Sequence, residues 1–121
     1  MNTKKILIVD DDSRNIFALR AVLRARSFEC QSCTGAEEAL RLLKSDAQID
    51  VVLIDMMMPD MDGYEAIPLI KKIPHRKDLL VISVTAQAMV GDEEKCLEAG
   101  ADGYISKPID IDKLVFILNR H

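Results

Sequence analysis

The sequence predicts an α/β fold, with a five-stranded parallel sheet flanked by helices. The first observation is three short aliphatic runs without polar alternation, a pattern typical of strands buried on both faces of a parallel sheet. These runs are Ile6–Val9, Val51–Ile54 and Leu79–Ile82. The second is that segments with helical spacing fill the gaps between the runs. The length of 121 residues suits one domain, which we take to span residues 1–121.

Two weaker strands complete the predicted sheet, Phe28–Ser32 and Gly103–Ser106. Strands and helices then alternate five times, and right-handed crossovers leave few topologies for such a chain. The leading candidate is the doubly wound, flavodoxin-like strand order 2-1-3-4-5 with five flanking helices. Ligands of such sheets bind at the carboxyl ends of the strands, near the switch point between the first and third strands.

Most of the predicted helices begin at residues that can cap them. Side chains of Ser, Thr and Asp accept hydrogen bonds from the free N–H groups of a first helical turn. The predicted caps are Ser13, Thr34, Asp62 and Asp110, with Thr34 in a capping box with Glu37. The fourth helix is predicted to run from about Ala88 to Ala99 and to stop at Gly100. Pro68 interrupts the third helical pattern. Because proline has no N–H group, it should kink this helix or delay its start, and the helix could restart there.

Composition and charge exclude several classes of protein. The formal net charge of −4 gives no electrostatic reason to expect direct binding of nucleic acid, which needs a basic patch. No stretch reaches the roughly 18 consecutive apolar residues of a membrane span. The segment Met1–Lys5 leads into only four aliphatic residues, unlike a signal peptide. The expected location is therefore the cytoplasm, without insertion into a membrane.

The three cysteines fit that location. Cys30 and Cys33 have the C-x-x-C spacing of some redox and zinc sites, and Cys96 stands alone. A structural zinc site needs four ligands, and the sequence offers no second cysteine pair and no suitable histidine pair. Packing of small apolar side chains on a strand and its exit is therefore the favoured interpretation of Cys30 and Cys33.

Polar residues gather at the predicted carboxyl ends of the strands. The first strand leads into Asp10–Asp12, the third into Asp55, the fourth into Thr85, and the fifth through Ser106 to Lys107. The acids of the first and third strands would be neighbours, and crowded carboxylates repel one another unless a cation joins them. Mg²⁺ suits such a place because it binds a few carboxylate oxygens, retains waters and binds phosphate.

These groups together form a candidate phosphoacceptor site. A carboxylate such as that of Asp55 can attack phosphorus and form an acyl phosphate. The charge of the phosphoryl group then needs neutralisation, for which Mg²⁺, the Lys107 ammonium and the Thr85 hydroxyl are suitable. Taken singly, each residue has an ordinary explanation, namely a solvated turn, a loop start, a helix cap or a surface lysine. The placement of all of them at four separate strand ends favours the functional interpretation.

The sequence around these residues resembles a known family. The segments that carry the resemblance are Ile6–Asp12, Val52–Asp55, Met58–Gly63, Val84–Ala86 and Gly103–Pro108. In this order and spacing they look like the receiver domains of bacterial two-component response regulators, and the resemblance covers essentially the whole chain. It implies a phosphorylation switch that acts in two-component or phosphorelay signal transduction.

The resemblance implies a role for each acidic position. Asp55 would receive a phosphoryl group from a histidine kinase or a histidine phosphotransfer protein. Asp11 would bind Mg²⁺ directly, and Asp10 mainly through water. Asp55 and the main-chain carbonyl of Met57 would complete the protein's ligands, and Mn²⁺ could substitute for Mg²⁺.

The resemblance also implies how the signal leaves the site. Lys107 would contact the phosphoryl oxygens, Thr85 would turn inward to the phosphoryl group, and Tyr104 would follow from an exposed to a buried position. The surface of the fourth helix, fifth strand and fifth helix would then change its preference for an output partner or a second copy of the chain. Three apolar residues lie on or near this predicted surface: Val90, Ile109 and Phe116.

Two further positions would set the lifetime of the phosphoryl group. Met57 and Gln87 each lie two residues beyond a site residue, and these positions border the phosphoryl group in the family, where they tune its hydrolysis. A bulky, apolar Met57 should hinder an attacking water. The resemblance therefore predicts a fairly long-lived phosphorylated form.

Alternatives remain at the level of the sequence. A small Mg²⁺-dependent phosphohydrolase of the haloacid dehalogenase type would also use an Asp nucleophile, but it needs a second Asp where this chain has Met57. A phosphorylation-independent scaffold of the same fold would not need the acidic, Thr and Lys residues. We favour a domain that is not an enzyme on an external substrate and catalyses only its own phosphorylation and slow dephosphorylation. Both a single-domain regulator and a receiver from a larger protein, such as a hybrid histidine kinase, fit the sequence.

Overall fold

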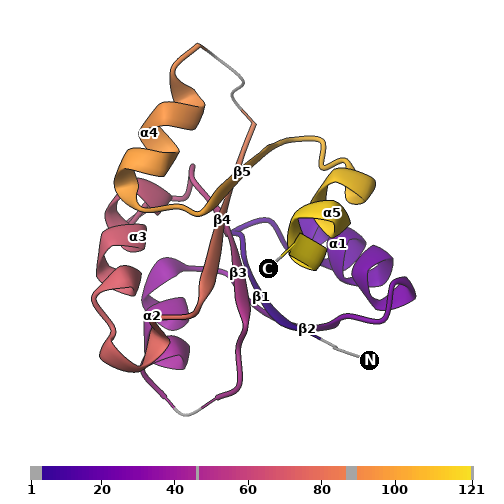
Figure 1. Ribbon diagram of the computed structural model, residues 1–121, viewed down its shortest axis with the longest axis horizontal. Helices are drawn as coiled ribbons and strands as arrows, with labels where there is room; N and C mark the ends of the chain where they lie inside the picture. The colour runs from indigo at the N-terminus through magenta and orange to yellow at the C-terminus, as the bar shows by residue number, and fades with distance from the viewer. Residues whose placement is uncertain (1–3, 46, 87–89, 121) are drawn as a thin grey trace.

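A computed structural model describes residues 4–45, 47–86 and 90–120. Within these residues the chain forms one five-stranded sheet between two layers of helices (Figure 1). The strands are β1 (Lys5–Val9), β2 (Glu29–Cys33), β3 (Val51–Asp55), β4 (Leu80–Thr85) and β5 (Gly103–Ser106). Their order is β2-β1-β3-β4-β5, and every neighbouring pair is parallel. The predicted fold class and strand order are confirmed.

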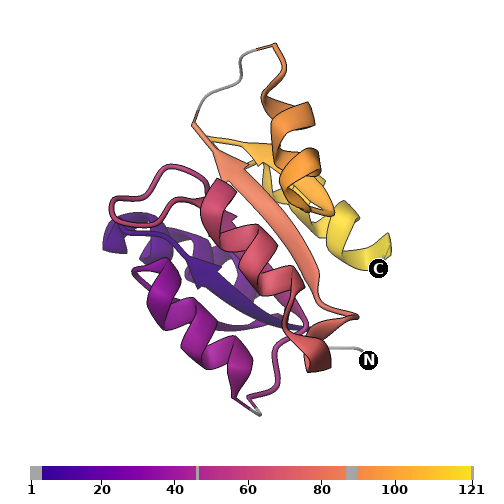
Figure 2. The ribbon, with the colours of Figure 1, turned by 90° about the vertical axis from the view of Figure 1, so that its left-hand side faces the viewer.

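The helices are divided between the two faces of the sheet. They are α1 (Ser13–Ala25), α2 (Ala36–Lys44), α3 (Gly63–Lys71), α4 (Asp92–Ala99) and α5 (Ile111–Arg120), with a short 3-10 helix, η1 (Pro74–Arg76), after α3. Helices α1 and α5 lie on one face and α2, α3 and α4 on the other, which Figure 2 shows from the side of the latter three. None of the helices in the described part of the chain is long and apolar enough to cross a bilayer.

The aliphatic strands contribute side chains to two cores, because successive residues of a strand point to opposite faces of the sheet. In β1, Ile6 and Ile8 belong to the core beneath α1 and α5, whereas Leu7 and Val9 belong to the core beneath α2 and α3. All residues of β3 and β4 are buried. The absence of polar alternation in the sequence therefore reflects a sheet that is covered on both faces.

The same alternation separates the two cysteines of the C-x-x-C pair. Cys30 and Cys33 are three residues apart on β2, so Cys30 packs against the core beneath α1 and α5 while Cys33 is buried in the opposite core. All three cysteines are free thiols. Burial, assisted by the charge of Glu38, raises the pKa of Cys33 to about 11. Cys30 and Cys33 cannot share a ligand, and the packing interpretation holds.

Two helix starts differ from those predicted. Asp12, rather than Ser13, caps α1, because its carboxylate accepts a hydrogen bond of 2.9 Å from a backbone N–H of the first turn. The extended backbone of Asp12 places its side chain over the helix end, as a cap requires. The capping box predicted at Thr34 is wrong, since Gly35 occupies the N-cap position of α2 and no side chain caps it.

The ends of α4 and the start of α5 are set by glycine and aspartate. Helix α4 begins at Asp92 because Gly91 has a φ of 94°, a left-handed conformation that a helix does not continue. The predicted start near Ala88 falls outside the described residues. Gly100 ends the helix with a φ of 116°, as predicted. Asp110 accepts hydrogen bonds from two N–H groups at the start of α5, which confirms its predicted cap.

Pro68 lies inside α3 without delaying or restarting it. The helix is continuous from Gly63 to Lys71. Its first turn is held by a capping box in which Asp62 accepts from the Glu65 N–H at 2.9 Å, while the Glu65 carboxylate accepts from the Asp62 N–H at 3.4 Å. Proline removes only one backbone hydrogen bond, and the reciprocal cap and the buried face of α3 offset that loss.

Candidate functional site

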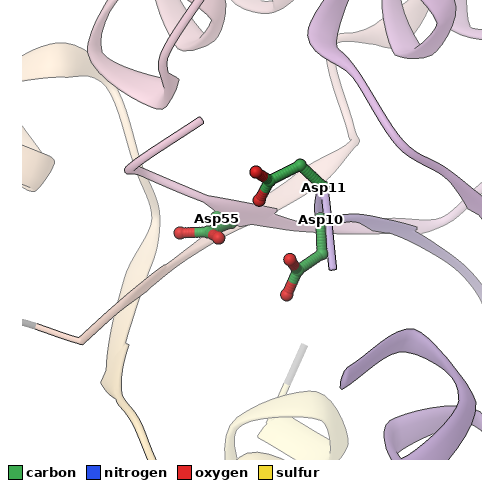
Figure 3. Close-up of side chains that lie close together, drawn as sticks. All are labelled: Asp10, Asp11 and Asp55. Carbon is green, nitrogen blue, oxygen red and sulfur yellow. The ribbon is translucent and has the colours of Figure 1, made fainter. Parts of the chain in front are cut away.

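The candidate site lies at the carboxyl edge of the sheet, where β1 and β3 end side by side. Val9 and Ile54 are paired neighbours on these strands, so the residues that follow them, Asp10 and Asp55, come together. Figure 3 shows these two side chains and that of Asp11 clustered at the strand ends. The fold therefore brings the acids of two distant sequence segments to one point, as the predicted strand order required.

The acidic cluster has the composition of a site for a hard cation. One ligand oxygen from each of Asp10, Asp11 and Asp55 lies within 4.8 Å of the other two. Asp10 and Asp55 are only 7% and 6% exposed, whereas Asp11 is exposed. Carboxylates this close, two of them withdrawn from water, repel one another. Oxygen ligands that are open to solvent on one side fit Mg²⁺, which retains several of its waters.

Lys107, which follows β5, supplies positive charge to the buried acids. Its Nζ lies 3.2 Å from Oδ2 of Asp55 and 3.4 Å from Oδ2 of Asp10. Burial of the ammonium acts to lower the pKa of Lys107, but the charges of Asp55 and Asp10 outweigh it, and the pKa is raised. Lys107 is therefore protonated and places its positive charge next to both carboxylates.

The carboxylate of Asp55 is held at both of its oxygens. Oδ1 accepts a hydrogen bond of 3.0 Å from the Met57 N–H, and Oδ2 faces Lys107. Burial is the largest influence on the pKa of Asp55 and raises it, and the charge of Asp10 also raises it. The hydrogen bond from the Met57 N–H and the charge of Lys107 lower this pKa, but the net shift is upward. The structure thus fixes the direction of a potential nucleophile whose ionised form is disfavoured by its surroundings.

The acidic triplet divides into three roles. Asp10 is buried, and its Oδ1 accepts a hydrogen bond of 2.9 Å from the Asp12 N–H. Asp11 points into the cluster from an exposed position. Asp12 caps α1 and does not belong to the cluster. The local turn at Asp10 therefore orders the two residues after it.

Thr85 and Tyr104 lie on neighbouring strands, β4 and β5. Thr85 is the last residue of β4 and is 3% exposed. Tyr104 is half-buried and packs against the core beneath α2 and α3. Burial, together with the nearby charge of Asp92, raises the pKa of Tyr104, so its hydroxyl is a neutral group at ordinary pH. Their positions are those that the sequence predicted, at the end of β4 and along β5.

The positions predicted to set the lifetime are only partly described. Met57 is 55% exposed, although Met56 and Met58 on either side of it are 0% and 7% exposed. Gln87 lies outside the described residues. On the predicted output surface, Val90 and Phe116 are exposed.

Gly63 supports the site through a close packing contact that the sequence did not reveal. A Cβ atom built on Gly63 would lie 2.3 Å from Sδ and 2.9 Å from Cα of Met56, the residue directly after Asp55. The Gly63 N–H also donates to the Met56 carbonyl at 3.2 Å. The start of α3 therefore rests on the backbone that carries Asp55, and only glycine leaves room for this contact. The available signal was a glycine within a first helical turn, where it is unfavourable without a packing reason.

The fold and site together define a flavodoxin-like domain with an acidic cluster and a lysine at the carboxyl edge of its sheet. Residues 6–119 match the response regulator receiver domain family. The chain belongs to this family of receiver domains of two-component signalling.

Two curated relatives differ in how much of their own length the chain matches. The chain is 37% identical over 116 residues to the signal transduction histidine-protein kinase BarA of Escherichia coli (strain K12), which covers 96% of this chain but only 12% of the kinase. It is 34% identical over 113 residues to the polar-differentiation response regulator DivK of Brucella ovis, which covers 93% of this chain and 91% of DivK. The chain thus corresponds to a small part of the first protein and to most of the second.

Solved structures show the same fold. The receiver domain of sensor histidine kinase PA1611 from Pseudomonas aeruginosa has a TM-score of 0.87 and 31% identity over 98% of this chain and 97% of that one, and it holds a magnesium ion in its active-site cleft. The receiver domain of Ssk1 from Saccharomyces cerevisiae, in complex with the histidine phosphotransfer protein Ypd1, has a TM-score of 0.84 at 22% identity over 93% of this chain and 84% of that one. The second likeness concerns the fold alone.

Proposed function

We propose that this domain is a phosphorylation switch in which Asp55 receives a phosphoryl group from a histidine kinase or a histidine phosphotransfer protein. The proposal rests on the convergence of the carboxylates of Asp10, Asp11 and Asp55 with the Lys107 ammonium at one edge of the sheet. An Asp55 oxygen would attack phosphorus and form an O–P bond, while the P–N bond of the donor breaks and its electron pair leaves with the imidazole. The Ypd1 complex of a domain with this fold supports this class of partner.

Asp10, Asp11 and Asp55, with the main-chain carbonyl of Met57, would hold Mg²⁺, Asp11 directly and Asp10 mainly through water. The bound ion would supply neutralisation of the charge on the transferring phosphoryl group. The close approach of the three carboxylates and the magnesium ion in the PA1611 receiver support this assignment. Mn²⁺ is the expected substitute, because it too is suited to carboxylate, carbonyl and water ligands.

Lys107 and Thr85 would complete the neutralisation of the phosphoryl oxygens. The ammonium of Lys107 is already directed at Asp55 Oδ2 and would move to the phosphoryl group once that oxygen is esterified. Thr85 would contact the phosphoryl group with its hydroxyl, and Tyr104 would move inward after it. One or two charge-assisted hydrogen bonds, each roughly 1.5–3 kcal/mol, are enough to shift a two-state equilibrium by ten-fold or more.

The phosphoacceptor assignment is tested by incubation with acetyl phosphate and Mg²⁺. Wild-type protein should acquire one acid-labile acyl phosphate that hydroxylamine removes, and Asp55→Asn should acquire none. Chelation of Mg²⁺ should prevent labelling. Labelling of another residue in wild-type protein, or unchanged labelling of Asp55→Asn, would overturn the assignment.

The same samples separate the competing functions. We propose that no external substrate is turned over, because Met57 stands where a phosphohydrolase of the haloacid dehalogenase type needs its second Asp. Turnover of p-nitrophenyl phosphate that depends on Asp55 would instead indicate a phosphohydrolase. A protein that neither labels nor turns over a phosphomonoester would be a scaffold.

The coupling of Thr85 to Tyr104 is tested with a variant that should still be phosphorylated. Thr85→Ala should be labelled to the same extent as wild type, because the nucleophile and its cation site are intact. Its amide resonances on β5 and α5 should shift much less on phosphorylation than those of wild type, since the hydroxyl that reads the phosphoryl group is gone. Equal shifts in the two proteins would remove Thr85 from the switch.

A further inference from the structure

The three consecutive methionines after Asp55 differ sharply in exposure. Met56 is fully buried against Gly63, and Met58 is 7% exposed, whereas Met57 between them is 55% exposed. Oxidation of a thioether by a two-electron oxidant requires contact between the sulfur and the oxidant, so exposure decides which methionine reacts. Within the triplet, Met57 is therefore the residue most accessible to an oxidant.

Met57 is also fixed beside the phosphoacceptor. Its N–H donates to Oδ1 of Asp55 at 3.0 Å. Because an N–Cα bond is about 1.46 Å, the Cα of Met57 lies no further than about 4.5 Å from that oxygen. The backbone that carries the Met57 side chain therefore lies at the border of the site.

The cysteines do not compete strongly for an oxidant. Thiols react as thiolates, and burial raises the pKa of Cys30 and brings that of Cys33 to about 11. Cys96 is fully buried. The thiols, which usually intercept a peroxide first, are thus protonated or covered. Among the methionines of residues 4–45, 47–86 and 90–120, Met57 is the most exposed, ahead of the partly buried Met61.

We propose that Met57 is an oxidation site through which a peroxide shortens the lifetime of the phosphorylated domain. The sulfur lone pair attacks a peroxide oxygen, the O–O bond breaks, and an S=O bond forms as water leaves; the thioether is oxidised and the peroxide reduced by two electrons. Reduction of the sulfoxide by a thiol-dependent reductase would reverse the change. The inference rests on the proposed phosphorylation of Asp55.

The effect on lifetime follows from the change in polarity. The thioether is apolar and a weak hydrogen-bond acceptor, so it does not hold a water molecule near the phosphorus. The sulfoxide oxygen is a strong acceptor on the same side chain and can bind and orient a water at the border of the site. Oxidation of Met57 should therefore accelerate hydrolysis of the acyl phosphate by several-fold.

The modification itself can be tested without any phosphorylation. Purified protein is treated with hydrogen peroxide, quenched with catalase and examined by peptide mass spectrometry. Met57 should be oxidised at least about five times faster than Met56 and Met58 because of its exposure. Equal rates at the three positions, or faster oxidation of either neighbour, would overturn the proposal.

The consequence is tested with labelled protein before and after oxidation. In wild type, peroxide should shorten the phosphoryl half-life several-fold, and a methionine sulfoxide reductase with dithiothreitol should restore it. Met57→Leu, which keeps a bulky apolar side chain without sulfur, should lose the response to peroxide. The matched control Met58→Leu should retain it. Met57→Gln, a polar mimic of the sulfoxide, should have a short half-life without peroxide.

The outcomes distinguish the two proposals. If wild type is not labelled by acetyl phosphate, the proposed function fails and the lifetime effect falls with it. If labelling is normal but the half-life does not respond to oxidation of Met57, only the present inference fails. A response that persists in Met57→Leu would assign the effect to another methionine and also overturn it.

Discussion

The two edges of the sheet handle charge in opposite ways. At the amino edge, the Arg76 guanidinium of η1 donates hydrogen bonds to four main-chain carbonyls, one in the last turn of α2 and three in the segment between α2 and β3. These carbonyls belong to Leu43, Ser45, Ala47 and Ile49. At the carboxyl edge, the buried carboxylates of Asp10 and Asp55 lie close together and share one ammonium, that of Lys107. The amino edge surrounds one positive charge with several carbonyl acceptors, whereas the carboxyl edge brings negative charges together.

The amino edge therefore serves stability, whereas the carboxyl edge is suited to binding. Arg76 is a planar donor whose geometry matches several acceptors at once, so it fastens a loop and needs no ligand. The carboxyl edge is incompletely neutralised, and its burial raises the pKa of Asp55. A site that is to bind a cation and a phosphoryl group must keep some charge uncompensated until they arrive, and it does so at a cost in stability.

The largest expected effect is at the amino edge. Arg76→Met removes all four hydrogen bonds and leaves carbonyls without their donor, which should lower the free energy of unfolding by about 3 kcal/mol. Arg76→Lys keeps the charge but not the planar fork, and should recover less than half of the loss. Urea unfolding measures both. Full recovery by lysine would show that charge alone matters at this edge.

A packing change at the carboxyl edge comes next. Gly63→Ala places a Cβ 2.3 Å from the Met56 Sδ and 2.9 Å from its Cα, so the backbone next to Asp55 must move. We expect a loss of about 2 kcal/mol in unfolding free energy and slower labelling by acetyl phosphate. Gly35→Ala is the matched control, because nothing lies within 4 Å of its Cβ position. Similar losses in the two variants would indicate a general effect of replacing glycine at a helix start.

Magnesium should relieve the repulsion at the carboxyl edge only. At a concentration ten times the dissociation constant, Mg²⁺ should stabilise wild type by about 1.4 kcal/mol, measured as a rise in unfolding midpoint. Asp11→Asn should respond much less, and Arg76→Lys should respond as wild type does. A response to Mg²⁺ that survives in Asp11→Asn would place the ion elsewhere.

The smallest effect has the opposite sign to the first two. Without Mg²⁺, Asp55→Asn should stabilise the fold by on the order of 1 kcal/mol at pH 7, since it removes an ionised group that the fold disfavours. Because the folded pKa of Asp55 is raised above the ordinary 3.8, the penalty is absent below pH 3.8 and grows as pH rises through the folded value. The advantage of Asp55→Asn should therefore disappear in acid. A variant less stable than wild type at pH 7 would show that the pair with Lys107 outweighs burial.

Much of this architecture could be predicted from local sequence pattern. The runs Ile6–Val9, Val51–Ile54 and Leu80–Ile82 are apolar at every position because both faces of the sheet are covered. This property can be recognised in the sequence without knowledge of any tertiary contact. The acids at the ends of β1 and β3 were found by the same reasoning, because the strand order brings these ends together. The roles of Tyr104, Met57 and Gln87 came only from the resemblance to a family. Helix caps were less predictable, as Asp12 and Gly35 show, because a shift of one residue depends on how the chain leaves the strand.

The residues that act through tertiary contacts could not be found in this way. Arg76 and Gly63 have no local signature of their roles. The partners of Arg76 are carbonyls about 30 residues away, and Gly63, at the start of α3, packs against Met56. The difference in exposure between Met56, Met57 and Met58 also cannot be inferred from the sequence, where the three residues are identical.

By itself, the sequence determined the order of strands, the acids and lysine at their carboxyl ends, and hence the kind of site this domain carries. These properties follow from the periodicity and chemistry of short segments, which act within one element. The tertiary structure alone decided which charges are buried, which are satisfied and which methionine meets solvent. Burial depends on everything that packs around a residue, and no short segment contains that information.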